Sequence, residues 1–185
     1  MDLGHDTVHA VATVVDLVNT RPGPTTVEGL ADVDDLAAFV ERREISAVGE
    51  LTADDVEDVR RLRARLYEVF QAADANGAVH LVNSLVADAR TTPRLTNHDG
   101  WPLHMHYFTP GARLAQRLAA DCGMALAFVL ASGEWARLAT CTAPDCDRVL
   151  VDLSRNRSRR YCDSRTCGNR LHVAAYRARQ RIPTT

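Results

Sequence analysis

The sequence predicts a mainly α protein: a helical body with one β-hairpin, followed by a small unit of two short strands and a helix. Two observations support this prediction. Apolar residues recur at helical spacing through most of the first 133 positions, with one short interval in which apolar and polar residues alternate. After position 140, four regularly spaced cysteines stand among short apolar runs. We therefore predict two domains, residues 1–136 and residues 137–185.

The body begins with three predicted helices. In the first, over residues 7–20, four valines share one face: Val8, Val11, Val15 and Val18. The prolines of RPGP at 21–24 end it. A short helix follows at 33–43 with Leu36, Phe39 and Val40 facing inward. Thr52 and Asp55 then form a capping-box pattern that opens a long helix.

The second half of the body contains two further helices and the hairpin. Asn76-Gly77 is predicted to end the long helix, and the apolar residues of 79–86 indicate the next one. The alternating stretch around Asp99-Gly100 predicts a hairpin with a two-residue turn. Thr109-Pro110 is a good N-cap and N1 pair for the last body helix, which Gly133 is predicted to stop.

Bulk composition narrows the class of protein. Apolar residues make up 46% of the 185, which is enough for a packed core. No apolar run approaches the roughly 18 residues needed to cross a bilayer, and the start MDLGHDTVHA lacks the positive region of a signal peptide. We therefore predict a cytoplasmic protein with no membrane partner, in which clustered thiols stay reduced and bind metal or do chemistry.

Four cysteines are spaced as C-x4-C-x15-C-x4-C: Cys141, Cys146, Cys162 and Cys167. Two pairs separated by a hairpin-sized stretch are typical of a tetrahedral thiolate site, and Zn²⁺ suits four sulfur ligands best. We predict one structural zinc, because four protein ligands leave no open position for catalysis. Two disulfides, incidental buried thiols and an iron–sulfur cluster are the alternatives. The predicted strands at 138–141 and 148–153 and a helix at 168–181 would surround this site.

Arginine is concentrated in the same region. Residues 1–140 contain 12 Arg against 20 Asp and Glu, whereas residues 141–185 contain 10 Arg against 4 Asp. A basic segment after an acidic body favours contact with a polyanion. The predicted nucleic-acid-binding residues are eight arginines: Arg155, Arg157, Arg159, Arg160, Arg165, Arg170, Arg177 and Arg181. Charge pairing with the body or with a partner protein is the alternative, and Arg170 is also a candidate to stabilise the metal site's negative charge.

The body offers weaker candidates for ligand binding. His5 and His9 are spaced i, i+4 on a predicted helix, and Asp16 and Asn19 lie near its end. His104 and His106 share one face of a predicted strand. No phosphate-binding loop, nucleophile elbow or paired-carboxylate pattern is present, so we predict no catalytic residues and no enzyme.

Several stretches carry a family resemblance: DLVNT at 16–20, RLRARL at 61–66, CTAPDCDRVLVDLSRN at 141–156, RRYC at 159–162 and CGNRLHVAAYRAR at 167–179. In these the chain resembles the bacterial CGNR zinc-finger family with an N-terminal ABATE domain. The resemblance implies an α-rich first domain and a treble-clef-like zinc module holding its ion through the four cysteines. It also implies a stress-linked transcription regulator that binds DNA through the finger.

The leading functional hypothesis is therefore a zinc-dependent, DNA-binding transcription regulator whose helical body senses a small-molecule effector or forms a homodimer. One alternative is a zinc-stapled protein-interaction module that binds no nucleic acid. The other is a small-molecule-binding body over which the finger acts as a lid.

Overall fold

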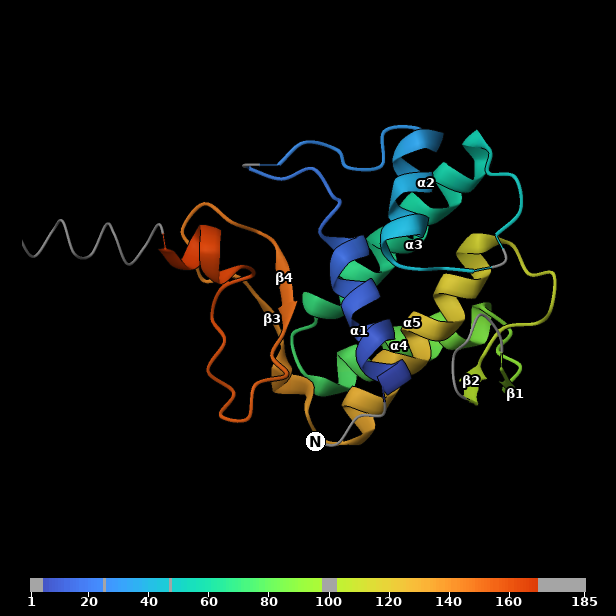
Figure 1. The fold of residues 1–185 in the computed structure, drawn as a ribbon. Helices are drawn as coiled ribbons and strands as arrows, with labels where there is room; N and C mark the ends of the chain where they lie inside the picture. Colours follow the sequence, from blue (N-terminus) through green and yellow to red (C-terminus); the bar gives the residue numbers. More distant parts are fainter. Residues whose placement is uncertain (1–4, 25, 47, 98–102, 170–185) are drawn as a thin grey trace, which may run out of the picture.

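Five helices build a body that carries the cysteine-rich unit on one side and a β-hairpin on the other (Figure 1). The computed structural model describes residues 5–24, 26–46, 48–97 and 103–169. The helices are α1 (His5–Val18), α2 (Val33–Arg42), α3 (Ala53–Phe70), α4 (Ala75–Asp88) and α5 (Leu114–Ala131). The strands are β1 (Arg94–Thr96), β2 (His104–His106), β3 (Leu138–Thr140) and β4 (Val149–Val151). This arrangement confirms the predicted mainly α fold.

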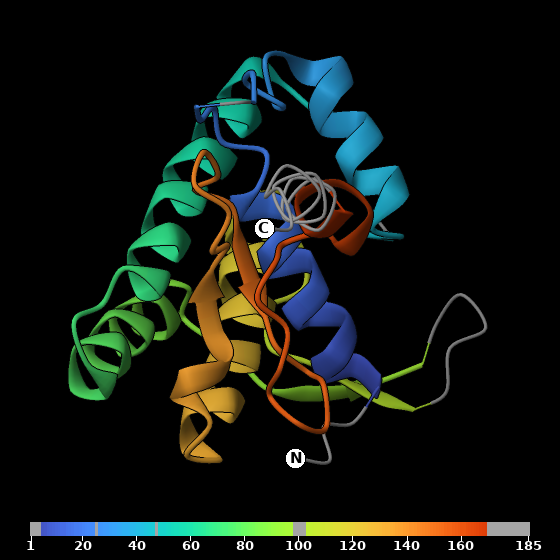
Figure 2. The same cartoon turned by 90° about the vertical axis from the view of Figure 1, so that its left-hand side faces the viewer.

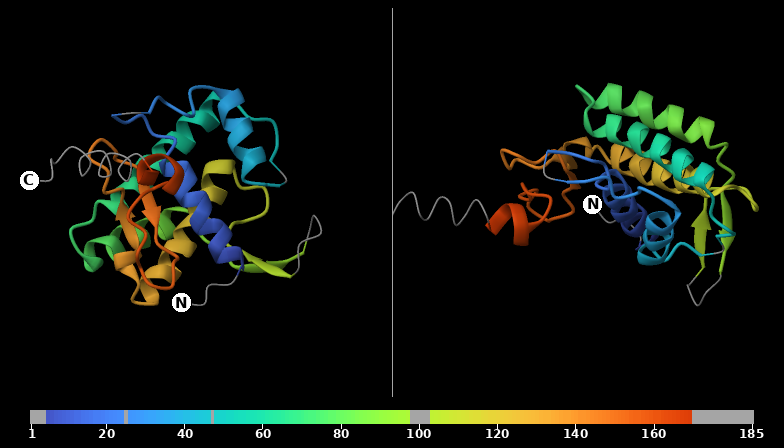
Figure 3. Two further views of the ribbon diagram at one scale, coloured as in Figure 1. Left: turned by 60° about the vertical axis from the view of Figure 1, so that its left-hand side comes forward. Right: turned by 90° about the horizontal axis from the view of Figure 1, so that it is seen from above.

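The helices form two groups. Helices α3, α4 and α5 lie side by side, and α1 and α2 cover one side of them, as the view from above in Figure 3 shows. The body core is made of side chains from all five helices, and its largest fully buried members include Leu17, Leu36, Phe39, Leu66, Leu85 and Leu126. The predicted inward residues Leu36 and Phe39 are fully buried, and Val40 is half-buried.

Helix α5 is the central helix of the body. Although its sequence is interrupted by Arg117 and Asp121, it is long and apolar enough to cross a membrane by length and composition alone. Half of it is buried inside the body, where it packs against α1, α3 and α4. These contacts account for its apolar character as that of a core helix.

Local capping chemistry sets the helix starts. Thr52 and Asp55 form the predicted capping box at α3, with the Thr52 N–H donating to the Asp55 carboxylate at 3.0 Å. Asp74 caps α4 by accepting the Gly77 N–H at 2.8 Å. Asn76-Gly77 therefore lies in the first turn of α4 and does not end α3, which stops at Phe70; this prediction was wrong.

Two further predictions in the body need correction. Thr109-Pro110 does not cap α5, because Gly111 has a φ of 79° and turns the chain before the helix begins at Leu114. On α1, Val8 is exposed and Val15 half-buried; the buried face instead contains Val11, Val14, Leu17 and Val18. This face is shifted because α1 is covered both by the other helices and by β4.

The hairpin occurs where the alternation predicted it. Strands β1 and β2 are antiparallel, with Arg94 opposite His106 and Thr96 opposite His104. Asp99-Gly100 itself lies outside the described residues.

The second hairpin joins the body to the cysteine-rich unit. Gly133, with a φ of 69°, ends α5 as predicted, and the single turn Trp135–Arg137 leads into β3. Figure 2 shows β3 and β4 in front of the body helices. Val149 and Val151 belong to the body core, whereas Leu150 between them packs among the cysteines. The alternation of a strand thus gives β4 one apolar face on each side.

Candidate metal centre

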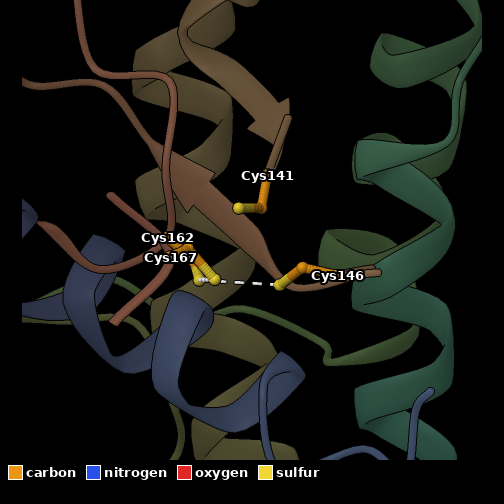
Figure 4. A group of neighbouring side chains, drawn as sticks. All are labelled: Cys141, Cys146, Cys162 and Cys167. Atoms are coloured by element: carbon orange, nitrogen blue, oxygen red, sulfur yellow. Dashed lines mark hydrogen bonds between the residues drawn. The ribbon is translucent and has the colours of Figure 1, made fainter. Parts of the chain in front are cut away.

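The four predicted cysteines converge on one point (Figure 4). Their sulfur atoms all lie within 4.8 Å of one another. The Sγ of Cys162 is 3.7 Å from the Sγ of Cys146 and 3.7 Å from that of Cys167. Cys141 and Cys167 are buried, and Cys146 and Cys162 are half-buried.

Backbone hydrogen bonds set this geometry. The Cys141 N–H donates to the Arg148 carbonyl at 2.8 Å, which extends the β3–β4 ladder by one residue. The Thr142 N–H donates to the Arg160 carbonyl at 3.0 Å and so brings the second cysteine pair beside the first. The turn Ser164–Gly168 then carries Cys167 back toward Cys162. The predicted helix over 168–181 lies outside the described residues from position 170 onward.

The distances fit a tetrahedral zinc site. A Zn–S bond of about 2.3 Å places two sulfurs of a regular tetrahedron about 3.8 Å apart. A disulfide would instead bring two sulfurs to about 2.05 Å, and all four cysteines are free thiols. Four sulfur ligands fill the coordination of the ion. The cysteines therefore form a closed site for one structural zinc, which confirms the prediction from their spacing.

The protonation of the thiols shows why the cluster needs a cation. Burial, together with the neighbouring thiols, raises the pKa of Cys162 strongly, and burial raises that of Cys146. For Cys141, burial is outweighed by hydrogen bonds from the backbone of Cys162 and Ala143, which lower its pKa. Four thiolates this close repel one another, and a bound divalent ion removes that repulsion.

A side-chain amide attaches the metal-bearing hairpin to the body. The Nδ2 of Asn19 donates to the Val149 carbonyl at 2.9 Å, and the Val149 N–H donates to the Asn19 Oδ1 at 2.8 Å. The Asn19 amide therefore pairs with the outer edge of β4 as a peptide group of another strand would. Although Asn19 was predicted as a ligand-binding residue, the structure uses it as a clamp between α1 and the zinc module.

A second attachment involves the loop after α1. Arg21 donates to the Asp147 carboxylate at 2.8 Å and lies over the Tyr67 ring, with its guanidinium carbon 3.5 Å from the ring centroid. Gly23 approaches the same carboxylate so closely that a Cβ there would lie 2.4 Å from Asp147 Oδ1. Asp147 follows the ligand Cys146, so this contact positions the first cysteine pair.

Buried polar groups organise the basic loop between β4 and Cys162. The guanidinium of Arg137 donates to the carbonyls of Asp152 and Ser154 at 2.7 and 2.9 Å. The Asp152 carboxylate accepts the N–H groups of Ser154 and Arg159, each at 2.8 Å. Burial raises the pKa of Asp152, but these hydrogen bonds outweigh it and lower the pKa overall. No sequence motif pointed to Arg137 or Asp152.

The predicted nucleic-acid-binding arginines fall into distinct groups. Arg155 and Arg160 are exposed on the loop. Arg157 pairs with the body residue Glu134 at 2.8 Å, and Arg159 donates to the Cys162 carbonyl at 2.6 Å, supporting a metal ligand. The side chain of Arg165 and the whole of three other arginines lie outside the described residues: Arg170, Arg177 and Arg181.

The predicted ligand-binding residues of α1 are not gathered at one site. Asp16 pairs with Arg43 at 3.1 Å, and Asn19 bonds to β4. His9 lines a cavity at the other end of α1. The side chain of His5 lies outside the described residues.

The fold and the site together define a class: a zinc-finger protein whose four-cysteine module is docked on a helical body. Comparison with protein families agrees. The ABATE model, described as "Putative stress-induced transcription regulator", matches residues 12–133, and the CGNR zinc finger model matches residues 137–180. Because the first match covers more than half of the chain, the protein belongs to the ABATE family. A search of the curated proteins returns no match.

Proposed function

We propose that this protein is a transcription regulator that binds DNA through its zinc module, with the helical body as the sensing or dimerising part. The observation that supports this most directly is the basic loop between β4 and Cys162. The Asp152 carboxylate accepts backbone N–H groups of the loop, and Arg159 donates to the Cys162 carbonyl, so the backbone that carries the exposed arginines is held in place. A loop whose backbone is held in place loses less conformational entropy on binding phosphates than a flexible one would.

Arg155 and Arg160 are the strongest candidates for phosphate contacts. Both are exposed, and within the described residues neither guanidinium group has a hydrogen-bond or ion-pair partner. Arg157 must first leave Glu134, whose carboxylate is also bonded to Arg137 at 2.9 Å. We therefore expect Arg157 to contribute less to DNA affinity than Arg155 or Arg160.

Binding of the zinc-loaded chain to random-sequence duplex DNA, measured across a range of salt concentrations, tests the proposal. We expect affinity to fall steeply with salt, and the double variant Arg155→Ala/Arg160→Ala to bind more weakly with a slope smaller by about 2. Arg61→Ala/Arg65→Ala removes two arginines from the surface of α3 and serves as the matched control; it should bind like the wild type. Absence of binding by the wild type at low salt would overturn the proposal.

The alternative of a protein-interaction module is favoured by one contact. Arg157 already binds a carboxylate, Glu134, which shows that the loop suits an acidic protein surface. This alternative would be supported if the protein did not bind DNA but did bind an acidic protein. The lid alternative receives less support, because no described residue of the module lines the cavity near His9.

Other predictions stay open in this proposal. Neither family description names an enzyme, and we assign no catalytic residue. The cytoplasmic location, the homodimer and the division at residues 136 and 137 stay predictions.

A further inference from the structure

A cavity of about 310 Å³ lies in the body, away from the zinc module. It is open to solvent on one side and is lined by the first half of α1, the segment after α2, strand β2 and helix α5. Figure 1 shows β2 and the zinc module on opposite sides of the body. This volume is in the range of small-molecule sites, which usually combine apolar walls with a few polar groups.

The walls are mainly apolar and aromatic. Tyr107, Phe108 and Phe128 line the cavity together with Leu118 and Ala125 of α5. The Phe108 ring is buried, and the Tyr107 and Phe128 rings lie with their centroids 6.3 Å apart. Such walls suit the flat or branched apolar part of a small organic molecule.

The histidines of β2 form one polar edge of the cavity. The Nε2 atoms of His104 and His106 are 2.9 Å apart, so one ring donates a hydrogen bond to the other. Within the described residues, the cysteine cluster is the only group of three or more metal-ligating side chains that lie close enough to share an ion. We therefore assign the histidine pair to the wall of an organic-ligand site.

The cations at this site are already engaged with the protein. Arg43 donates to Asp16, to the Thr13 hydroxyl and to the His9 carbonyl, each at 3.1 Å. Arg117 donates to the Ser46 carbonyl at 2.6 Å and lies over Phe108, with its guanidinium carbon 4.7 Å from the ring centroid. These arginines are held in the walls and are poorly placed to bind an anionic ligand.

The carboxylate of Asp121 differs from them. It accepts a long hydrogen bond of 3.3 Å from the Tyr107 N–H, and its other oxygen has no hydrogen-bond partner within the described residues. Burial raises the pKa of Asp121 to about 6, against the opposing effects of the Tyr107 N–H, Arg117 and His104. At neutral pH this carboxylate is mostly ionised, so a half-buried negative charge faces the cavity. Its second oxygen can accept a hydrogen bond from a ligand.

We propose that this cavity binds a small organic cation, whose ammonium or amidinium group pairs with Asp121 and whose apolar part packs between Phe108 and Phe128. The aromatic walls would also attract the positive charge through their ring faces. Binding at this site does not depend on DNA binding. Only its role as the effector of a regulator rests on the function proposed above.

Calorimetric titration of the zinc-loaded chain at neutral pH, without DNA, tests the site with three probes of similar shape. These are 2-phenylethylammonium, the neutral 2-phenylethanol and the anionic 3-phenylpropanoate. We expect the ammonium to bind at least about tenfold more tightly than either of the others, since a charged partner for Asp121 is worth at least that factor. Equal affinities, or no binding of the ammonium at millimolar concentration, would overturn the proposal.

Asp121→Asn keeps the shape of the side chain and removes its charge, so it should abolish the preference for the ammonium. Asp34→Asn, on the exposed first turn of α2, is the matched control and should keep it. Thermal unfolding of each variant confirms that the body is intact. A preference that survives in Asp121→Asn would show that the charge is recognised elsewhere. Because DNA is absent, failure here leaves the DNA-binding test unaffected.

Discussion

At the scale of single residues, Asn19 gains its role from chemistry that few side chains offer. Val149 has its N–H and its carbonyl both turned toward Asn19, and a side-chain amide presents one donor and one acceptor side by side to match them. Aspartate has the same shape, but an ionised carboxylate can only accept hydrogen bonds and cannot donate one. Asn19 of the DLVNT stretch therefore joins the helical body to the hairpin that carries the zinc site. The sequence alone does not reveal this contact, because Val149 is 130 positions away from Asn19.

We predict that Asn19→Asp destabilises the protein by about 2 to 3 kcal/mol, because it removes one hydrogen bond and sets a carboxylate against the Val149 carbonyl. Urea unfolding of the zinc-loaded chain measures this free energy. Asn83→Asp makes the same change at an exposed position of α4 and should alter stability little. Equal losses in the two variants would show that the clamp contributes nothing.

A second residue-scale prediction concerns acid stability. Glu28 accepts two hydrogen bonds from Arg63, at 2.6 and 2.7 Å, and one from the Leu30 N–H at 2.8 Å. The Arg63 hydrogen bonds, against burial, lower the pKa of Glu28 from 4.5 to about 2. A carboxyl group whose pKa is lower in the folded state stabilises it above pH 4.5, and this contribution disappears as the pH falls toward 2.

The free energy of unfolding should therefore depend less on pH between about 4.5 and 2 in Glu28→Gln than in the wild type. Urea titrations at a series of pH values provide the measurement. Glu68→Gln, at an exposed position of α3, should leave the wild-type pH dependence intact. Parallel curves for all three proteins would mean that the Glu28–Arg63 pair does not respond to acid.

At the scale of elements, the capping box of α3 links the sequence pattern directly to stability. Thr52→Ala removes the side-chain acceptor for the Asp55 N–H and the hydroxyl that donates to the Asp55 carboxylate at 2.7 Å. We expect a loss of about 1 kcal/mol in the free energy of unfolding. Thr91→Ala, at a position between α4 and β1, serves as the control. A larger loss in the control than in Thr52→Ala would contradict the assignment.

The helix caps and the metal ligands show which features of a fold can be predicted from sequence and which cannot. The cap at Thr52 was predicted because both partners lie within one turn. The prediction that Thr109-Pro110 caps α5 was wrong, because the chain turns at Gly111, two positions later, before the helix begins. The cysteine ligands were predicted by spacing, whereas Arg137 and Asp152, which order the loop beside them, carry no local pattern. Structure that depends on neighbouring residues can therefore be predicted from the sequence, but contacts between distant segments cannot.

At the scale of the whole molecule, α1 spans the distance between the two candidate sites. Its first half lines the cavity, and Asn19, one residue beyond its end, holds β4. Glu134 and Arg137, in the turn that follows α5, bind the basic loop, and α5 itself lines the cavity with Leu118 and Asp121. Helix α1 with Asn19, and α5 with the turn that follows it, therefore connect the cavity to the zinc module, and the proposed sensing role of the body could use this connection.

The division of the apolar core predicts how the molecule responds to loss of zinc. The body core draws on all five helices and includes Val149 and Val151. Among the residues that the structure describes, the core around the metal has four buried members, two of them ligands: Cys141, Ala143, Leu150 and Cys167. So small a core cannot order the cysteine loops by itself, and zinc supplies on the order of 10–16 kcal/mol to such sites.

Removing zinc with a chelator should therefore release the cysteine loops while the helices of the body persist. We expect most of the helical circular dichroism to remain and trypsin to cut rapidly within residues 155–160. Cys162→Ser should lose its zinc and show the same cleavage, whereas Cys122→Ala, which removes a buried thiol outside the cluster, should retain about one zinc per chain. If the helical signal instead collapsed together with the metal, the body would depend on the module for its stability. The two apolar cores would then have to form as one cooperative unit, contrary to the division seen along β4.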